Sequence, residues 1–520
     1  MNPVSANESF AAQDRQGVVL LATLGERQTI RYVLEEVAES IRVLEASKYQ
    51  FKVLIVDDSR DSEFNDHVNA AFNDLHISGK VIDGPKNGLG GAIVYGFETV
   101  LADPKIGFVV NLDADGQHDA RQMPDLVRAH FATQSSITIG SRWTKGGTAP
   151  GLSRKRKVLS KVSATMLHRV GVPASVKDPT TSFRVYSRSA LEKCWREVID
   201  FDGYAFFGGI IAVAASQKLS ISEVPIRFRP RWAGESKMKL GRIAETALKL
   251  WAIGSRAKMI KRRLDLGVRY GMHKTVLNTS VSENHEVMVC AEASTARHQV
   301  AYLKNLISGN VLEVGAGVGS FSSHLAPLAN QLVCLEPNQS YFSELQKSTD
   351  HITNVSLANE TLAQYGEKQL SRSDDKKFET IFYAHVLEHI EQDLDELKLA
   401  SNFLADSGKL IVVVPSIPRL YGSVDALSGH YRRFTRSELM SISKMAGYDV
   451  ESIKYFNPIA IFPYWVMYRI LKVKNVGSGQ LGLYDRVFVP IAYRTINLFN
   501  GKLPGVNLIA VLKKIDYKDM

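Results

Sequence analysis

Two aspartates one residue apart follow an apolar run that has the length and composition of a buried strand. The run covers residues 108–112, and the segment 113–117 after it reads Asp-Ala-Asp-Gly-Gln. Carboxylates at the end of a strand can hold a hard divalent ion, which prefers oxygen ligands and can neutralise a departing diphosphate. The spacing therefore indicates Mg²⁺ or Mn²⁺, with Asp113, Asp115 and Gln117 as ligands. An exposed turn is the alternative, because such turns use Asp-x-Asp freely.

Glycines recur at every second position of another segment, directly after an apolar Asn-Val-Leu run. They are Gly315, Gly317 and Gly319, and Glu313 stands two residues ahead of the first. A glycine-rich turn between a strand and a helix lets backbone N–H groups approach a ligand closely. The spacing alone does not name the cofactor, since dinucleotide-binding folds use similar turns. Glu336 ends the next predicted strand, where a carboxylate can accept hydrogen bonds from both hydroxyls of a ribose.

Both segments lie in series of alternating strands and helices, which is the pattern of an α/β fold. In the first series the apolar runs predict strands at 18–23, 51–56, 108–112 and 137–140, and helices at 29–44, 65–75 and 88–100. In the second series they predict strands at 311–314, 331–335, 380–383 and 409–414. We therefore expect two α/β domains, the first built on a mostly parallel sheet.

The stretch between the two series has a different character. Apolar residues such as Leu248, Trp251 and Ile253 are interleaved there with basic ones, which predicts an amphipathic helical connector. It packs between the two domains or lies on a membrane surface, and the pattern leaves both open. The expected organisation is a polar tail at 1–16, a first domain at 17–240, the connector at 241–285 and a second domain at 286–520.

Short matches in a fixed order cover nearly all of the first series. They are the segments 22–26, 56–59, 87–92, 113–118, 139–142, 178–184 and 223–237. In this the chain resembles a family 2 glycosyltransferase of the dolichyl- or polyprenyl-phosphate sugar synthase type. The resemblance implies a GT-A fold, a nucleotide-sugar donor and a lipid phosphate acceptor.

The resemblance also implies roles for individual residues. Those matching the nucleotide-sugar positions are Ala22, Leu24, Glu26, Asp57, Asp113, Ala114, Asp115, Arg142, Arg231 and Lys237. The candidate catalytic residues are Asp115 and Asp178. A lipid phosphate is already ionised near neutral pH, so its attack needs little help from a general base. Asp178 would then orient the acceptor or its loop, and a turn-forming Asp-Pro is the equal alternative.

Two departures from the family pattern bear on substrate identity. Residues 22–26 read Ala-Thr-Leu-Gly-Glu, where the family usually has Pro-Thr-Tyr-Asn-Glu. Gly208 and Gly209 stand where an acidic residue is common. The donor and the acceptor are therefore less firmly indicated than the class of reaction.

The second series resembles a class I S-adenosylmethionine-dependent methyltransferase, with a Rossmann-like fold, over about residues 290–515. The resemblance rests on the glycine segment, Glu336, the Leu-Glu-His sequence at 387–389 and the Gly-Lys-Leu that opens a strand at 408. It implies that S-adenosylmethionine contacts Glu313, Gly315, Gly317, Gly319 and Glu336, with Asn359 and Glu360 near the adenine by position.

Histidines mark the expected methyl-transfer site. His385 and His389 fall beside it, and His430 lies in the unusual polar and aromatic stretch 420–435. We expect this stretch to line the acceptor pocket, with His389 and His430 as candidate catalytic residues. The alternatives are structural histidines and a structural loop in which Thr435 caps the next helix.

Composition narrows the location and the partners. The cysteines Cys194, Cys290 and Cys334 are too few and too far apart for a disulfide framework, which fits a reducing cytoplasm. The net charge of +10 includes a basic run at 154–157, but no nucleic-acid motif accompanies it. No apolar stretch is long enough to span a membrane. The aromatic stretch 456–471 predicts an interfacial patch, a substrate lid or buried core.

We therefore expect a cytoplasmic enzyme. Whether it attaches peripherally to the cytoplasmic face of the membrane stays open. It would transfer a sugar to a polyprenyl phosphate or related acceptor with metal, and methylate a sugar or related acceptor with S-adenosylmethionine. The alternative is one active glycosyltransferase whose methyltransferase-like domain serves binding or regulation. A scaffold with two degenerate sites is disfavoured, because Asp113, Asp115, Gly315, Gly317 and Glu336 are intact.

Overall fold

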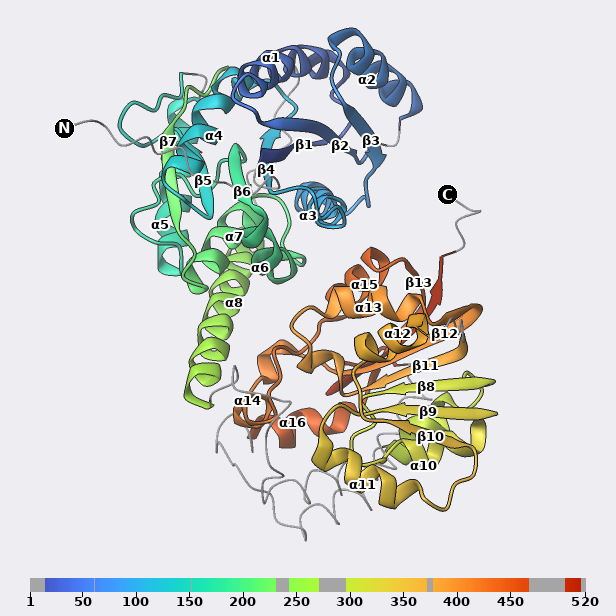
Figure 1. Cartoon of the computed structure of the whole chain (residues 1–520). Coiled ribbons are helices and arrows are strands. Elements are labelled where there is room, and N and C mark those ends of the chain that lie inside the picture. Colours follow the sequence, from blue (N-terminus) through green and yellow to red (C-terminus); the bar gives the residue numbers. More distant parts are fainter. Residues whose placement is uncertain are drawn as a thin grey trace, which may run out of the picture. The chain divides into compact units, whose positions relative to one another are not determined.

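The computed structural model describes residues 15–59, 61–150, 152–230, 243–270, 296–371, 377–466 and 501–515. Contacts within the chain divide it into two compact units, Met1–Lys261 and Arg262–Met520. Each unit is built on its own sheet (Figure 1). The predicted tail 1–16 lies almost wholly outside the described residues, as do Arg231, Lys237, Cys290, the end of the connector at 271–285 and the end of the aromatic stretch at 467–471.

The first unit contains a seven-stranded sheet in the order β3-β2-β1-β4-β6-β5-β7. Its strands are β1 (Gln16–Thr23), β2 (Gln50–Asp57), β3 (Gly79–Asp83), β4 (Phe108–Asp113), β5 (Ile137–Ser141), β6 (Arg184–Ser187) and β7 (Ile221–Pro225). Its helices are α1 (Arg27–Glu45), α2 (Ser62–Leu75), α3 (Gly88–Leu101), η2 (Ala120–Gln122), α4 (Met123–Ala132), α5 (Arg154–Arg169), α6 (Arg188–Val198) and α7 (Tyr204–Ser216). All pairs are parallel except those of β6, which runs antiparallel to β4 and β5. The predicted mostly parallel sheet is confirmed.

Alternation along β1 shows why its residues form a buried central strand. Val19 and Leu21 belong to one core with Ile30 and Val33 of α1. Leu20 points to the other face, where its side chain lies against Gly96 of α3. Figure 1 shows α1 and α2 on one face of this sheet and α3 on the other. A strand covered on both faces reads as a continuous apolar run, which is why the sequence predicts it.

The predicted connector is a helix over the residues that the structure describes. This helix, α8 (Ile243–Tyr270), has Ile253, Ala257 and Ile260 buried, and Ala257 lies beside Gly171 of the first unit. Its Arg256 forms ion pairs with Glu197 at 3.2 Å and Asp200 at 3.1 Å. The described helices include none with both the length and the apolar character needed to cross a membrane.

The second unit contains a seven-stranded sheet in the order β10-β9-β8-β11-β12-β14-β13. Its strands are β8 (Asn310–Val314), β9 (Gln331–Leu335), β10 (Val355–Ala358), β11 (Phe378–Ala384), β12 (Leu404–Pro415), β13 (Tyr448–Phe456) and β14 (Asn507–Lys514). Its helices are α10 (Ser322–Leu325), η3 (Ala326–Leu328), α11 (Gln339–Thr349), α12 (Leu362–Ser371), η4 (Leu387–His389), α13 (Asp393–Ser401), η5 (Pro418–Leu420), α14 (Ser423–Leu427), α15 (Arg436–Met445), η6 (Pro458–Ala460) and α16 (Ile461–Tyr464). The first five strands in the order are parallel, and β14 pairs antiparallel with both β12 and β13.

Parallel pairing brings the carboxyl ends of neighbouring strands to one edge of each sheet. In open α/β sheets ligands bind at this edge, where loops and helix N-termini meet. The aspartate segment follows β4, and the glycine segment follows β8. The two predicted sites therefore lie where the fold provides room for them.

Candidate active sites

The carboxyl ends of β1, β2 and β4 lie side by side in the first unit. Ala22 pairs with Asp113 of β4, and Thr23 pairs with Asp57 of β2. Asp57 is fully buried, and its carboxylate accepts hydrogen bonds from the Ser59 amide at 3.1 Å and hydroxyl at 2.5 Å. The structure therefore brings together Ala22, Asp57 and Asp113, which the sequence assigns to the nucleotide sugar.

The corner between β1 and α1 is held to the same edge. The Glu26 carboxylate accepts a hydrogen bond from the Leu24 amide at 2.6 Å and another from the Thr23 hydroxyl. Thr29 donates from its hydroxyl to the Ala114 carbonyl at 2.8 Å. This leaves the Leu24 side chain 51% exposed at the edge of the sheet. Glu26 thus shapes the corner on which Leu24 is presented.

The aspartate pair has the donor chemistry that a hard divalent ion requires. Asp113 ends β4 and is partly exposed, and Asp115 accepts a hydrogen bond from the Gln117 amide at 3.0 Å. Gln117 is buried, and its side-chain nitrogen donates to the Arg229 carbonyl at 3.3 Å, which turns it toward the protein. Two carboxylates at an open strand end fit an ion whose remaining ligands come from a diphosphate.

His118 is a buried residue beside Asp113. Its Nδ1 is 3.6 Å from Asp113 Oδ2. Burial lowers the pKa of His118 to about 4, so the ring is neutral at physiological pH. A neutral ring does not compete with a metal ion for the Asp113 carboxylate, so the pair stays suited to cation binding.

An ion pair that the sequence did not predict holds the segment before residue 230 against α1 and the loop after β4. Arg229 donates to both carboxylate oxygens of Glu36 at 2.7 Å and to the His118 carbonyl at 3.0 Å. Phe228 forms a bridge with His118. The segment that leads to the predicted phosphate ligands Arg231 and Lys237 therefore starts beside the loop that carries the two aspartates.

Arg142 and Asp178 form a buried bidentate ion pair. The Arg142 guanidinium donates to the two Asp178 oxygens at 2.7 Å each, and the Arg142 amide donates at 2.9 Å. Asp178 is fully buried, and its own amide donates to Glu223 at 2.8 Å. These contacts support a positioning role for Asp178, which holds Arg142 in place, because the carboxylate faces this arginine.

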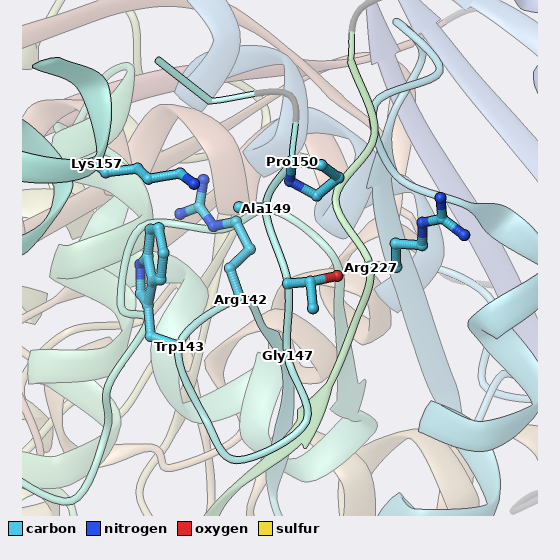
Figure 2. Close-up of a pocket in the computed structure, with 8 residues that line it drawn as sticks. Arg142, Trp143, Gly147, Ala149, Pro150, Lys157 and Arg227 are labelled. Atoms are coloured by element: carbon cyan, nitrogen blue, oxygen red, sulfur yellow. The ribbon is translucent and has the colours of Figure 1, made fainter. Parts of the chain in front are cut away.

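Arg142 also lines an open pocket of about 630 Å³ (Figure 2). The other lining residues are Trp143, Gly147, Thr148, Ala149, Pro150, Lys157 and Arg227. Figure 2 shows the Lys157 side chain reaching toward the Arg142 guanidinium, whereas the Arg227 side chain points away from both. Lys157 and Arg142, whose charge is shared with Asp178, lie beside an indole ring, a set that suits an anion with an apolar portion.

The glycine segment of the second unit turns closely against the loop after β11. Gly315 and Gly317 have φ of +69° and +59°, conformations that glycine adopts without strain. A Cβ on Gly315 would lie 2.5 Å from the Val386 side chain. The Gly317 amide donates to Glu336 at 2.8 Å, and the other Glu336 oxygen accepts from the Asn338 amide at 2.8 Å. The predicted cofactor residues Gly315, Gly317 and Glu336 therefore lie together.

The two residues predicted to lie near the adenine come directly after β10. Asn359 donates from its side chain to the Glu336 carbonyl at 2.7 Å. Glu360 pairs with Lys368 of α12. Asn359 therefore supports the backbone at Glu336, and the cofactor roles of Asn359 and Glu360 stay predictions.

Glu313 faces the protein interior. Its carboxylate accepts hydrogen bonds from Ser322 at 2.6 Å and from the Cys334 thiol at 3.3 Å. Burial raises the pKa of Glu313 from 4.5 to about 7. The contacts support an indirect role, in which Glu313 holds the glycine turn by way of α10 and β9.

Replacing Glu313 by glutamine is expected to stabilise the second unit at high pH. The folded state disfavours the Glu313 anion, so the contribution of Glu313 to stability is fully present below pH 4.5 and is lost as the pH rises from 4.5 to about 7. Glutamine removes this loss, and the gain in free energy of unfolding should be roughly 2–3 kcal/mol larger at pH 8 than at pH 5. Urea-dependent hydrogen exchange of β8 measures it. An equal effect at both pH values would contradict the prediction.

The predicted catalytic histidines meet in one cluster. His389 and His430 have ring centroids 4.7 Å apart in an edge-to-face arrangement. Burial lowers the pKa of His389 to about 4, so its ring is neutral. His430 Nδ1 lies 3.1 Å from Asp425, which is fully buried and has its pKa lowered to about 2, its carboxylate lying against the Arg433 guanidinium. The same loop ends in the predicted helix cap, in which Thr435 and Glu438 form a capping box.

The described part of the aromatic stretch, 456–466, packs in part against the same loop. Ala460 shares a small apolar core with Leu420. The Tyr464 hydroxyl donates to Asp425 at 3.2 Å, and the Arg433 guanidinium lies 4.3 Å from the centre of the Tyr464 ring. Phe462 is exposed. These contacts favour a packed role for the residues near Tyr464, whereas the exposed Phe462 leaves the interfacial patch and the lid open.

The two folds and their sites define a glycosyltransferase joined to a methyltransferase. The model for "Glycosyl transferase family 2" matches residues 18–195, and a "Methyltransferase domain" model matches 291–453. The polyprenol monophosphomannose synthase of Mycolicibacterium smegmatis is 30% identical over 252 residues, which are 47% of this chain and 89% of that protein. The undecaprenyl-phosphate mannosyltransferase of Micrococcus luteus is 30% identical over 219 residues, 41% of this chain and 87% of that protein.

A solved S-adenosylmethionine-dependent methyltransferase of Archaeoglobus fulgidus aligns over 43% of this chain and 94% of its own, at 14% identity and a TM-score of 0.29. The chain belongs to glycosyltransferase family 2. It also carries a methyltransferase domain, so the predicted order of a GT-A-like domain followed by a Rossmann-like one is confirmed.

Proposed function

We propose that the protein is bifunctional. Its first domain transfers a sugar from a nucleotide sugar to a polyprenyl phosphate or related lipid phosphate, and needs a divalent ion at Asp113 and Asp115. Its second domain transfers the methyl group of S-adenosylmethionine to a sugar or related acceptor. The two relatives named above are a polyprenol monophosphomannose synthase and an undecaprenyl-phosphate mannosyltransferase, which supports the first activity.

The observation that carries the first proposal is the cationic pocket beside the nucleotide-sugar edge. Arg142 comes from the end of β5, and Lys157 from the first turns of α5. A lipid phosphate needs cations for its head and apolar surface for its first isoprene units, and Trp143 offers such surface. Asp178 fixes the orientation of the Arg142 side chain, because the ion pair is buried and bidentate.

The divalent ion, when bound, offsets the negative charge that gathers on the leaving diphosphate. The chain's own contribution is to hold the aspartates at a fixed edge. Thr29 ties Ala114 to α1, and Arg229 ties the following loop to Glu36. Arg231 and Lys237, which follow this anchor, remain proposed ligands of the donor phosphates.

The same helix that supplies Lys157 presents an apolar stripe. Val158, Val162 and Met166 of α5 are 62%, 42% and 41% exposed, and a spacing of four residues puts them on one face. Lys161 flanks the stripe. A basic amphipathic helix of this kind can lie in a membrane interface. This supports an acceptor pocket that receives its lipid from the membrane surface.

Replacing Lys157 by alanine is expected to raise the KM for polyprenyl phosphate about tenfold with a smaller effect on the donor, which corresponds to the loss of one partly screened charge contact of about 1.4 kcal/mol. Lys155→Ala removes the same charge from the same helix at a residue that does not line the pocket, and it should leave the KM close to wild type. Initial rates over a series of acceptor concentrations separate the two. Equal effects of both variants would mean that general charge, and not this pocket, recruits the acceptor.

A two-label assay tests the complete proposal. Purified protein is given a panel of nucleotide sugars, polyprenyl phosphate and methyl-labelled S-adenosylmethionine. We expect lipid-linked sugar for at least one donor and methyl label in the sugar or a related acceptor. Sugar transfer without any methyl transfer to these acceptors would support the alternative in which the second domain only binds.

A further inference from the structure

A buried carboxylate in the second unit is left without hydrogen bonds. Glu388 lies in η4, directly after β11, and is fully buried. Across the described ranges, neither of its carboxylate oxygens has a hydrogen-bond partner, and neither has the buried Nδ1 of His389. His385 Nδ1 and His430 Nε2 lie 3.5 and 4.0 Å from Glu388 Oε1, too far for well-formed hydrogen bonds. Buried charged groups are normally paired, hydrogen-bonded or bound to a metal.

The groups around Glu388 have the spacing of a metal site. One ligand atom from each of Glu388, His389 and His430 lies within 4.8 Å of the other two. Ligands that bind one ion at 2.0–2.2 Å in tetrahedral geometry lie roughly 3–4 Å apart, so a small inward movement closes the site. Two imidazoles and one carboxylate suit zinc, cobalt, manganese or iron, whereas magnesium and calcium prefer an all-oxygen set.

A second layer of contacts orients one of these ligands. His430 Nδ1 lies 3.1 Å from Asp425, which directs Nε2 toward Glu388. Asp425 is itself fixed by the Arg433 guanidinium at 2.6 Å and by the Gly422 amide at 2.8 Å. A carboxylate on the far nitrogen of a histidine is the usual support of a metal-bound imidazole. It fixes the tautomer and increases the basicity of the ligand.

The cluster adjoins the cofactor loop. Val386 stands between His385 and Glu388, and its side chain packs against Gly315. His385 has φ of +58°, an uncommon conformation for a residue that is not glycine. Strained backbone of this kind is often found at functional sites. An ion held by η4 would therefore lie near the methyl donor that the proposed function assigns to the glycine segment.

We propose that Glu388, His389 and His430 bind a divalent transition-metal ion of the zinc class. Three protein ligands leave at least one position for an outside oxygen. The acceptor class that fits is a hydroxyl compound, such as a sugar, that binds through oxygen. The ion would favour the deprotonated hydroxyl, and the methyl group moves from sulfonium to that oxygen as the proton leaves to solvent. This acceptor role rests on the proposed methyltransferase activity, but the metal site itself does not.

Cobalt(II) serves as the probe, because its visible absorption is strong in a tetrahedral site and weak for the six-coordinate ion in water. The full chain carries D113N and D115N, so that the aspartate site of the first domain does not contribute. We expect one Co²⁺ per chain with a spectrum that Zn²⁺ abolishes. His430→Ala should weaken binding at least about 100-fold, given that loss of an outer partner alone costs 10–100-fold. Glu388→Gln should do the same, and His351→Ala, at a 72% exposed histidine of the same unit, should not.

The result that overturns the proposal is a cobalt spectrum that is absent, or that His430→Ala leaves unchanged. Where Glu388→Gln does not fold, His430→Ala and His389→Ala carry the test. Calorimetry with S-adenosylmethionine on the same samples separates the two proposals. Cofactor binding without cobalt binding removes the metal site and leaves the methyltransferase. Cobalt binding without cofactor binding keeps the metal site and removes the methyltransferase proposal.

Discussion

Replacing Asp115 by asparagine is expected to lower kcat for sugar transfer by roughly 100- to 1,000-fold, the scale seen when one group that stabilises transition-state charge is removed. The leaving diphosphate gains negative charge as the glycosidic bond breaks, and an ion held by one carboxylate opposes it less well. The fold should survive, because asparagine keeps a side-chain oxygen. This oxygen can accept the hydrogen bond that the Gln117 backbone amide donates to Asp115 at 3.0 Å. Turnover as a function of Mn²⁺ and Mg²⁺ concentration measures the effect.

Asp125→Asn is the matched control for this variant. Asp125 lies in the first turn of α4 of the same unit with a 73% exposed side chain, so the change removes the same charge at a residue outside the candidate metal ligands. It should leave kcat within a factor of two, a factor that corresponds to about 0.4 kcal/mol. Asp115→Asn should also leave S-adenosylmethionine binding unchanged. Turnover that persists in a chelator would show that Asp115 does not act through a metal ion.

Strands that are covered on both faces could be predicted from their own residues. The predicted strands at 18–23, 51–56, 311–314 and 331–335 all lie within β1, β2, β8 and β9. Strands that depend on distant partners could not. β6 has four residues and begins with a buried arginine, and β13 alternates polar and apolar residues as an edge strand does. β6 carries no signal that separates it from a loop, and the alternation of β13 is interrupted at the irregularity between Val450 and Ser452.

The sites show the same division. Glycines and carboxylates at strand ends are visible in sequence, because their chemistry and their place in the strand are both local. The Arg142–Asp178 pair joins residues 36 positions apart, and each was predicted singly in a role toward the ligand. Likewise Glu388 was read only as part of a sequence match. The position of Glu388 beside His430 depends on the loop after β12, which the local sequence does not place. The pattern of Glu388 and His389 side by side, with another histidine downstream, is nevertheless a signal to test for metal binding.

Replacing Gly317 by arginine is expected to abolish measurable S-adenosylmethionine binding, a loss of at least about 100-fold or 3 kcal/mol. Gly317 has φ of +59°, and no atom lies within 4 Å of the place where its Cβ would be. The added side chain therefore enters the open space above β8 and β9 that the cofactor needs, and it strains the amide that donates to Glu336 at 2.8 Å. Calorimetric titration of the full chain measures the effect, with saturable heat expected for the wild type.

The contribution of backbone strain can be separated, because the same unit offers a glycine in a matching conformation. Gly447 has φ of +87°, again with no atom within 4 Å of its Cβ position, but it lies ahead of β13. Since β13 and β12 both pair antiparallel with β14, Gly447 is at the edge opposite the glycine segment. Gly447→Arg should therefore cost stability and keep cofactor affinity. If both variants lost affinity equally, unfolding would explain the loss. If the wild type gave no heat, the second domain would not bind S-adenosylmethionine, and its matching fold would have to serve another ligand.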